Sequence, residues 1–517
     1  MTARSPAAPG SEVPAAGLSS VAPTPPVRRA AITNLGCKVN QAEMDAVARL
    51  LRARGVEIAA DATAADLHLV NTCTVTAAAD DKSRKAVRRA RRASPAAMVI
   101  VTGCAVQVAA ASFAEVDPAA RLVANEAKDG LLAEVELLLG LPTEPGDFPD
   151  GDGPIGDRPH RPLAAALPTL AGVEVEGIAD ARARIDRTRA YVKVQDGCSF
   201  FCTYCIIPRA RGPERSLAPE VVLADVRRAL AAGHREVVLT GINIGTYDGG
   251  RSERGPRGTH LRAALTLPGL VRRILAETPV ERVRLSSIEP QHVDDDLLAA
   301  WTEEGAGRCL PHLHLPLQSG DDGVLRRMGR RYASADYARC VERVRAAIPG
   351  VAIHADVIAG FPGEDDDAFA RTRAFLGDLD PAGLHVFRYS SRPGTPAERM
   401  EGQVPEAARR ERAAALLEDA AAARRRFAAR AEGGHRTVLF EEHADARDPA
   451  AGWMGHAGDY VVVRASAPGG RSLAGEIGVV AVDGSDPADP ERAIGRIERI
   501  VAAPVVGRAL PVVPFPA

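Results

Sequence analysis

Short apolar runs and amphipathic stretches alternate along the first part of the chain. Three runs predict β-strands: residues 31–35, 67–71 and 98–102. The first helical stretch between them places Met44 and Leu51 on one face and ends at Gly55. Because strands that alternate with helices form parallel sheets, we expect an open parallel α/β domain over residues 29–140.

The same alternation resumes after a segment rich in Pro, Gly and Asp. Six further runs predict strands: residues 191–194, 236–239, 282–285, 312–315, 351–356 and 384–388. Six strand–helix units predict a partial (β/α)6 barrel, because a closed barrel of eight units needs about 250 residues. An Ala/Arg/Glu-rich stretch predicts a long helix over residues 405–430. We place this central domain at residues 186–430.

The pattern changes after Gly433 and Gly434, where short strands replace helices. Four runs predict a small all-β barrel over residues 431–505: 437–440, 460–464, 475–482 and 492–500. Three segments rich in Pro, Gly, Ala or Val predict a disordered tail, a linker and a second tail: residues 1–28, 141–185 and 506–517. The expected fold class is therefore α/β, with an added all-β domain.

The overall charge and composition restrict the function. The net charge is −2, so any RNA binding must come from local basic patches. No run reaches the roughly 18 apolar residues of a membrane helix, and the first 28 residues lack the apolar core of a signal peptide. We expect a cytoplasmic protein without a membrane partner. The eight cysteines are few and clustered, which favours metal ligands over disulfides.

Three cysteines with the spacing Cx3Cx2C follow the first strand of the central domain: Cys198, Cys202 and Cys205. Cysteine thiolates bind [4Fe–4S] clusters, and three of them leave one iron free for a small molecule. A structural zinc site is the alternative. Zinc usually takes four ligands, however, and the nearest candidate for a fourth, His234, follows a predicted helix. We therefore predict an iron–sulfur cluster at this strand end, where barrels of this kind place their chemistry.

A second group of cysteines, Cys37, Cys73 and Cys104, is spread widely in the sequence. Each of them nevertheless follows one of the first three predicted strands directly. Because ligands bind beyond the carboxyl ends of the strands in an open parallel sheet, we expect these thiols to converge. Buried structural cysteines are the alternative. We predict a second iron–sulfur cluster here, again with one iron free.

The Cx3Cx2C segment resembles the radical-SAM superfamily. The resemblance implies that the free iron chelates S-adenosylmethionine, which is cleaved by one electron to methionine and a 5′-deoxyadenosyl radical. Turns at three later strand ends, TGINIG, LPLQSG and DVIAGFPGE, are similar to superfamily segments that contact this cofactor. Each turn by itself is also typical of an ordinary Gly-rich turn. The implied cofactor contacts are Thr240, Gly241, Gln318, Ser319, Asp356, Gly360 and Glu364.

The two cysteine triplets in this domain order resemble the methylthiotransferase family over residues 29–505. The segments TNLGCKVNQAE and VNTCTVTAAADDKSRKAVRRA are most similar to the branch that acts on N6-threonylcarbamoyladenosine, just 3′ of the anticodon in tRNA. Branches that act on isopentenyladenosine in tRNA or on a ribosomal-protein aspartate are nearer to GCQMN and GCPKN. In this family the C-terminal barrel is a TRAM domain, which binds RNA or another substrate.

The resemblance implies insertion of a methylthio group at C2 of the modified adenosine. Since this C–H bond is not acidic enough for a general base, we predict no catalytic side-chain acid or base. The implied cofactors are two [4Fe–4S] clusters and S-adenosylmethionine, with the N-terminal triplet assigned to sulfur transfer. The implied partners are tRNA, a flavodoxin- or ferredoxin-type electron donor and a sulfur donor. A non-catalytic iron–sulfur protein that binds RNA or carries electrons is the alternative, although electron carriers use four cysteines per cluster.

A basic run on the second predicted helix, Lys82–Arg92, holds seven Lys or Arg among eleven residues. Such groups neutralise phosphates, although a solvated helix face is the alternative. The predicted RNA contacts are Lys85, Arg88, Arg89, Arg91 and Arg92. Other basic candidates are Arg209, Arg211, Arg215 and Arg424–Arg426. Cys309 and Cys340 are predicted to be structural, and His312 and His314, which alternate on a strand, are predicted to serve packing or polar lining. For Asp196 and Glu289, substrate contact and an ordinary turn role are both open.

Overall fold

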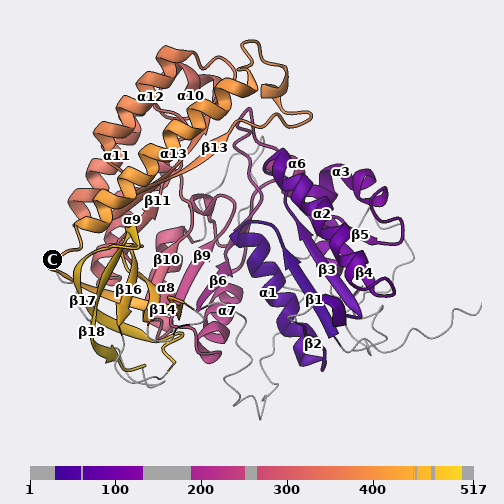
Figure 1. Ribbon diagram of the computed structural model, residues 1–517, viewed down its shortest axis with the longest axis horizontal. Helices are drawn as coiled ribbons and strands as arrows, with labels where there is room; N and C mark the ends of the chain where they lie inside the picture. The colour runs from indigo at the N-terminus through magenta and orange to yellow at the C-terminus, as the bar shows by residue number, and fades with distance from the viewer. Residues whose placement is uncertain are drawn as a thin grey trace, which may run out of the picture.

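A computed structural model of the chain describes residues 29–59, 62–131, 135, 188–250, 265–445, 448, 451–466 and 472–503. These residues form an α/β unit, a curved α/β unit beside it and a small β-barrel (Figure 1). The predicted fold class is therefore confirmed. The predicted tails and the predicted linker at 141–185 lie outside the described residues.

The first unit is a parallel sheet with strand order β2-β1-β3-β4-β5. Its strands are β1 (Arg29–Asn34), β2 (Glu57–Ile58), β3 (Leu67–Thr72), β4 (Met98–Gly103) and β5 (Arg121–Val123). Its helices are α1 (Lys38–Ala53), α2 (Ala77–Ala93) and α3 (Cys104–Ala114), with short helical turns η1 (Ala62–Ala64) and η2 (Asn125–Gly130). Every residue of β3 is buried, as in a central strand covered on both faces. The sequence pattern did not predict β2 and β5, because each is too short for a recognisable apolar run.

The central unit consists of two three-stranded parallel sheets, β10-β9-β6 and β11-β12-β13. Single bridges, Val283 to Cys309 and Ser287 to His314, join the two sheets into one open barrel wall. The strands are β6 (Arg189–Lys193), β9 (Glu236–Thr240), β10 (Arg282–Leu285), β11 (His312–His314), β12 (Ala352–Ala359) and β13 (Gly383–Arg388). The predicted partial (β/α)6 barrel is thus confirmed.

Helices cover the outside of this wall, and a small two-stranded ribbon, β7 (Gln195–Asp196) with β8 (Arg215–Ser216), lies at its first turn. The helices are α6 (Ile207–Arg211), α7 (Pro219–Ala231), α8 (Leu267–Glu277), α9 (Asp295–Ala299), α10 (Asp322–Met328), α11 (Ser334–Ala347), α12 (Asp366–Leu379) and α13 (Glu406–Ala429). Short helical turns are η3 (Ile244–Thr246), η5 (Pro290–His292), η6 (Ala300–Glu304) and η7 (Pro396–Arg399). Aspartates cap three of these described helices: Asp294 accepts a hydrogen bond from Leu297 N, Asp321 one from Val324 N, and Asp365 one from Ala368 N.

The C-terminal unit is a closed β-barrel with strand order β14-β15-β16-β18-β17. Its strands are β14 (His435–His443), β15 (Trp453–Ala457), β16 (Val462–Ser466), β17 (Ile477–Asp486) and β18 (Asp489–Val501). The predicted all-β unit is confirmed, but the prediction of four strands was wrong, because β15 (WMGHA) has no regular alternation of apolar and polar residues. That this barrel is a TRAM domain stays a prediction.

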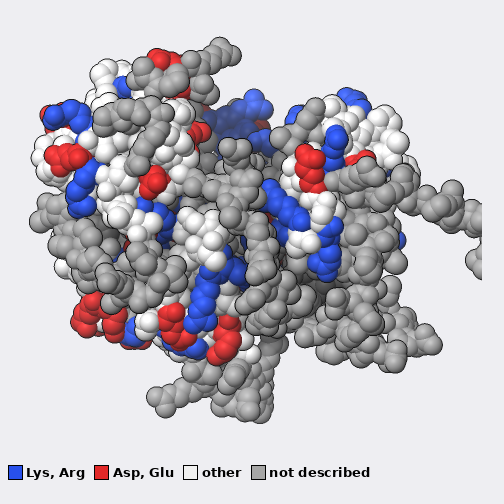
Figure 2. All heavy atoms as spheres, turned by 90° about the horizontal axis from the view of Figure 1, so that it is seen from below, with Lys and Arg blue, Asp and Glu red and all other residues white. Residues whose placement is uncertain are grey.

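The β-barrel docks on the central unit through two arginines of β10. Arg282 donates to the main-chain oxygens of Thr437 and His456, and Arg284 donates to those of Ala457 and Gly458. On the face drawn in Figure 2, basic and acidic side chains are interspersed among the coloured atoms, in line with the small net charge. Within the described part of the chain, no helix combines the length and the apolar character needed to cross a membrane.

Candidate functional site

The N-terminal cysteines lie at the ends of three neighbouring strands. Cys37 follows β1 and caps α1, Cys73 follows β3, and Cys104 follows β4 as the first residue of α3. The strands β1, β3 and β4 are adjacent in the sheet (Figure 1), so the three cysteines that follow them share its carboxyl edge. Burial raises the pKa of Cys37 and Cys73, and the charge of Cys104 adds to both shifts, which places the three thiols within electrostatic reach of one another.

Polar side chains surround this triplet. Asn125 Nδ2 donates to Cys104 Sγ at 3.4 Å, and the Ser83 hydroxyl accepts a hydrogen bond from Cys73 N at 3.2 Å. Burial raises the pKa of Cys73 to about 11, so this thiol keeps its proton unless a metal ion replaces it. Three thiols at one sheet edge, with polar groups oriented toward them, are a donor set that fits an iron–sulfur cluster.

The central triplet lies in the loop between β7 and α6. Cys198, Cys202 and Cys205 are all partly exposed, and their charges act on one another. Phe201, between the first two cysteines, has a left-handed φ of 52° and a largely exposed ring. This backbone turn brings the cysteines of the loop together at some cost in strain.

Arg330, in the turn between α10 and α11, supports this loop. Its guanidinium donates to Cys202 Sγ at 3.5 Å and forms an ion pair with Glu289. Tyr332 accepts further hydrogen bonds from the same guanidinium at 2.9 and 3.1 Å. Glu289, which the sequence left open, therefore orients an arginine beside the cysteine loop.

A buried charged network joins the two triplets. Glu43 on α1 accepts hydrogen bonds from Lys128 (2.6 Å), Lys193 (2.9 Å) and Arg211 (3.0 Å). Arg211 and Lys193 also bind Asp196, at 2.9 and 2.7 Å. Desolvation raises the pKa of Asp196, but Arg211 and Lys193 outweigh it and hold that pKa well below its usual range. Asp196 and Arg211 thus have internal partners, and their place is between the two cysteine groups.

The short helix α6 spans the distance between the triplets. It begins two residues after Cys205 and ends at Arg211, whose charge acts on Cys37 and Cys104. Asn125, which binds Cys104, also donates to the main-chain oxygen of Ala210 at 2.8 Å. At 1.5 Å of rise per residue, α6 itself is on the order of 10 Å long.

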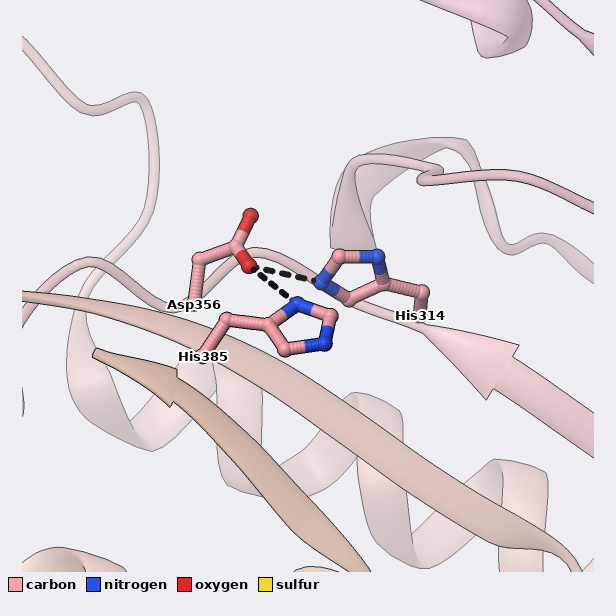
Figure 3. Close-up of side chains that lie close together, drawn as sticks. All are labelled: His314, Asp356 and His385. Atoms are coloured by element: carbon pink, nitrogen blue, oxygen red, sulfur yellow. Dashed lines mark hydrogen bonds and ion pairs between the residues drawn. The ribbon is translucent and has the colours of Figure 1, made fainter. Parts of the chain in front are cut away.

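Three polar side chains project from β11, β12 and β13 toward the inside of the central wall (Figure 3). Asp356 Oδ1 accepts hydrogen bonds from His314 Nε2 at 2.8 Å and from His385 Nδ1 at 3.1 Å. The three ligand atoms also lie within 4.8 Å of one another, a donor set that divalent metals use. The hydrogen bonds from both imidazoles to Asp356, and one from the Ser287 hydroxyl to His314 Nδ1, already satisfy this cluster.

Tyr460 of the C-terminal barrel closes the same interior from one side. Its ring stacks on His312 with centroids 4.5 Å apart, and Arg284 lies over it at 4.8 Å. Its hydroxyl accepts a hydrogen bond from Arg189 at 3.2 Å. His312 and His314, predicted to serve packing or polar lining, are therefore part of the polar lining.

The predicted cofactor contacts lie at the carboxyl end of β9, in the segment after β11, and in or just after β12, where Asp356 is inside the strand and not at its end as predicted. Gln318 has a left-handed φ of 73°, and its main chain bridges to β12. Ser319 Oγ pairs with Thr372 Oγ1 at 3.1 Å, and Glu364 binds Gly360 N and Arg412, at 2.8 and 2.9 Å. Gln195 Oε1 holds the turn after Thr240 and Gly241 by accepting from Ile242 N and Asn243 N, at 3.0 and 2.8 Å. Ser319 and Glu364 thus have internal partners that position their turns.

The basic helix α2 presents most of its predicted RNA contacts to solvent. Lys85, Arg88, Arg89 and Arg92 are exposed. Arg91 differs, because it pairs with Asp117 at 2.9 Å and donates to the main-chain oxygens of Pro95 and Ala97. The other basic candidates are mostly engaged: Arg209 binds Pro393 O, Arg215 binds Asp196, Arg424 binds Glu491 and Arg426 binds Asp380.

Family models match two parts of the chain: that of the uncharacterized protein family UPF0004 over residues 29–125, and that of the Radical SAM superfamily over residues 192–376. The threonylcarbamoyladenosine tRNA methylthiotransferase MtaB of Bacillus subtilis (strain 168) is 34% identical over 84% of this chain and 89% of its own length. The chain belongs to the radical-SAM methylthiotransferase family. Membership makes the protein a radical-SAM enzyme, which uses an iron–sulfur cluster and S-adenosylmethionine, and removes the non-catalytic alternative.

Two further comparisons describe the range of this likeness. The tRNA-2-methylthio-N(6)-dimethylallyladenosine synthase of Novosphingobium aromaticivorans is 32% identical over 74% of this chain and 79% of its own length. The radical S-adenosylmethionine methyltransferase TsrM of Kitasatospora setae has a TM-score of 0.50 at 16% identity, covering 72% of this chain and 77% of its own. The likeness to TsrM shows the fold alone.

Several site residues of this methylthiotransferase were missed from the sequence. They are His385, Tyr460 and Arg330. The alternating polar residues of HLH (312–314) predicted a polar lining at most. The same alternation in HAD (354–356) is the signal that could have extended this lining to the neighbouring strand. Tyr460 and Arg330 reach the site only through long-range packing, so no local pattern indicated them.

Proposed function

We propose that this enzyme inserts a methylthio group at C2 of N6-threonylcarbamoyladenosine in tRNA. The observation that carries the proposal is that α6 begins two residues after Cys205 and ends at Arg211, whose charge acts on Cys37 and Cys104. One site can thus generate a radical while the other delivers sulfur to the same base. Relatives from Bacillus subtilis and Thermotoga maritima, each 34% identical, carry the name of this activity.

We infer two [4Fe–4S] clusters. Cys37, Cys73 and Cys104 would hold one, and Cys198, Cys202 and Cys205 the other, each leaving one iron for an exchangeable ligand. Bound S-adenosylmethionine and the clusters supply radical and sulfur chemistry that side chains lack. The proposed contacts of S-adenosylmethionine are Thr240, Gly241, Gln318, Ser319, Asp356, Gly360 and Glu364.

The protein's own groups position and tune these sites. Arg330, fixed by Glu289, donates toward Cys202, and Asn125 donates toward Cys104. Hydrogen bonds and nearby positive charge stabilise a cluster in its more reduced state. Arg330 is therefore proposed to ease electron entry at the central site, for which an external flavodoxin- or ferredoxin-type donor is expected.

The polar interior favours the threonylcarbamoyl substrate over the dimethylallyl one. The interior surface presents His314, Asp356, His385 and Tyr460. An apolar dimethylallyl group would desolvate these groups without pairing them, whereas the hydroxyl, carbonyl and carboxylate of threonylcarbamoyl can form hydrogen bonds. Exposed basic residues of α2 are proposed to bind tRNA phosphates. A separate sulfur donor and a cytoplasmic location complete the proposal.

The proposal is tested with anaerobically reconstituted enzyme, reductant and S-adenosylmethionine. Anticodon stem-loops carrying N6-threonylcarbamoyladenosine or isopentenyladenosine serve as substrates, with a ribosomal-protein mixture as a third. Nucleoside mass spectrometry should find the methylthio product on the threonylcarbamoyl stem-loop. Product on isopentenyladenosine or on protein instead would refute the substrate assignment.

A further inference from the structure

Lys38 is the first residue of α1 and directly follows Cys37, a proposed cluster ligand. It is half-buried, and the groups whose charges act on it most strongly are Tyr460, Arg189, Arg284 and Asp356. Its charge in turn acts on His312. Since these residues line the interior of the central unit, Lys38 extends from the first unit toward the same interior.

The other charged groups of this interior have partners. Glu236 binds Arg282 at 2.7 Å and Arg284 at 2.9 Å. Arg189 pairs with Glu441 at 3.0 Å. The two imidazoles of His314 and His385 donate to Asp356, as Figure 3 shows. The interior is therefore internally matched in charge, apart from one lysine.

Lys38 is that exception. Among the residues that the structure describes, none accepts a hydrogen bond from its ammonium group, and none forms an ion pair with it. A half-buried ammonium group without a partner is costly, and an anionic group on a bound ligand would offset that cost. Lys38 is thus placed to bind an anion in the interior of the central unit, next to the N-terminal triplet.

The substrate carries such an anion. The N6 substituent of N6-threonylcarbamoyladenosine ends in a carboxylate, whereas a dimethylallyl group is uncharged. N6 and C2 flank N1 on one edge of adenine, so a group that holds the N6 substituent lies on the side from which C2 receives sulfur. We infer that Lys38 binds the carboxylate of the threonylcarbamoyl group and so selects this substrate. The inference rests on the proposed function.

Three stem-loops test this role: one with N6-threonylcarbamoyladenosine, one with its carboxyl methyl ester and one with isopentenyladenosine. The wild-type enzyme should prefer the acid to the ester in kcat/KM. Lys38→Gln should lower kcat/KM for the acid about 10–100-fold, the range expected for a lost hydrogen bond to a charged group, and leave the ester nearly unchanged. Lys38→Arg should retain most of the preference for the acid.

Two controls separate this role from others. Iron content and reductive cleavage of S-adenosylmethionine without tRNA should be equal in wild type and Lys38→Gln, because Lys38 is a proposed ligand neither of a cluster nor of S-adenosylmethionine. Lys82→Gln, on the exposed face of α2, should affect acid and ester alike, because it can change only contacts to the phosphates.

Each contrary outcome has its own meaning. Equal losses on acid and ester by Lys38→Gln, or impaired cleavage of S-adenosylmethionine, would overturn the role of Lys38 while the proposed function stands. A wild-type enzyme that modifies only the isopentenyladenosine stem-loop, or none of the three, would overturn both.

Discussion

Arg211 donates a hydrogen bond to Glu43 at 3.0 Å, and both side chains are almost completely buried. Glu43 follows Cys37 on α1, and Arg211 follows Cys205 at the end of α6. This ion pair therefore connects the two polypeptide segments that present the proposed cluster ligands. Because the relative position of the two sites decides whether one base can reach both, the pair links packing directly to function.

Replacing Arg211 with Met should uncouple the two sites. The change removes the positive charge of Arg211 from beside the buried carboxylates of Glu43 and Asp196. Breaking a buried ion pair in this way typically costs about 3–5 kcal/mol of unfolding free energy. Denaturant unfolding should show this loss, and methylthio product should fall more than cleavage of S-adenosylmethionine. The exposed pair of Arg273 with Glu277 is the matched control, and Arg273→Met should cost less than about 1 kcal/mol. A cost for Arg211→Met as small as that of the control would contradict the structural role of this pair.

Each cysteine triplet should control a separate step. Changing Cys198, Cys202 and Cys205 to Ala should halve the iron per chain, about four of the eight atoms expected, and abolish cleavage of S-adenosylmethionine. The same change at Cys37, Cys73 and Cys104 should also halve the iron but preserve cleavage while product is lost. Iron analysis and quantification of 5′-deoxyadenosine and of methylthio nucleoside measure these outcomes. Cys340→Ala, in the core, is the control and should retain full iron. Full methylthiolation by the N-terminal triple variant would show that this triplet is structural.

The exposed face of α2 should bind tRNA through phosphates. Replacing Lys85, Arg88, Arg89 and Arg92 with Gln should weaken binding and reduce the slope of log affinity against log salt, by about 0.7–0.9 per lost phosphate contact. Iron content should not change. Arg91 is left intact, because its pairing with Asp117 supports the helix. An unchanged salt slope would mean that α2 is only a solvated face.

Acid stability should depend on Glu236. Burial raises the pKa of this carboxyl, but Arg284 and Arg282 outweigh it and hold the pKa at about 2, below its usual value of 4.5. Because the folded pKa is depressed, this group stabilises the fold fully above pH 4.5, and the stabilisation is lost as pH falls toward 2. Each pH unit within that window costs at most about 1.4 kcal/mol.

Glu236→Gln removes this dependence. The variant should be less stable near neutral pH, because two buried arginines lose their counter-charge, and the difference from wild type should shrink between about pH 5 and about pH 3. Urea unfolding of cluster-free protein at several pH values gives the comparison. If the unfolding free energies of the two proteins fall in parallel as the pH is lowered, Glu236 is excluded as the titrating group.

The sequence by itself determined the class of the fold and the cysteines of the proposed sites. Period-two and helical patterns are local properties of the chain. All nine strands that they predicted in the two α/β units therefore lie within a few residues of observed strands, namely β1, β3, β4, β6, β9, β10, β11, β12 and β13. The position of Cys37, Cys73 and Cys104 after strand ends also follows from local patterns, because parallel topology brings such ends to one edge. Very short strands such as β2 and β5 were missed, since a few residues carry no period.

Only the tertiary structure decided how these parts face one another. Glu43, Lys128, Lys193 and Arg211 come from four distant segments, and their pairing depends on how the two α/β units dock. Tyr460 enters the interior from another unit, and Lys38 differs from an ordinary helix-surface lysine only because the surrounding charges are already paired. A long-range contact leaves no period in the sequence, because the chain between its two ends is free to vary in length and composition. The cysteines could therefore be found from the sequence, whereas the groups that we propose select the substrate could not.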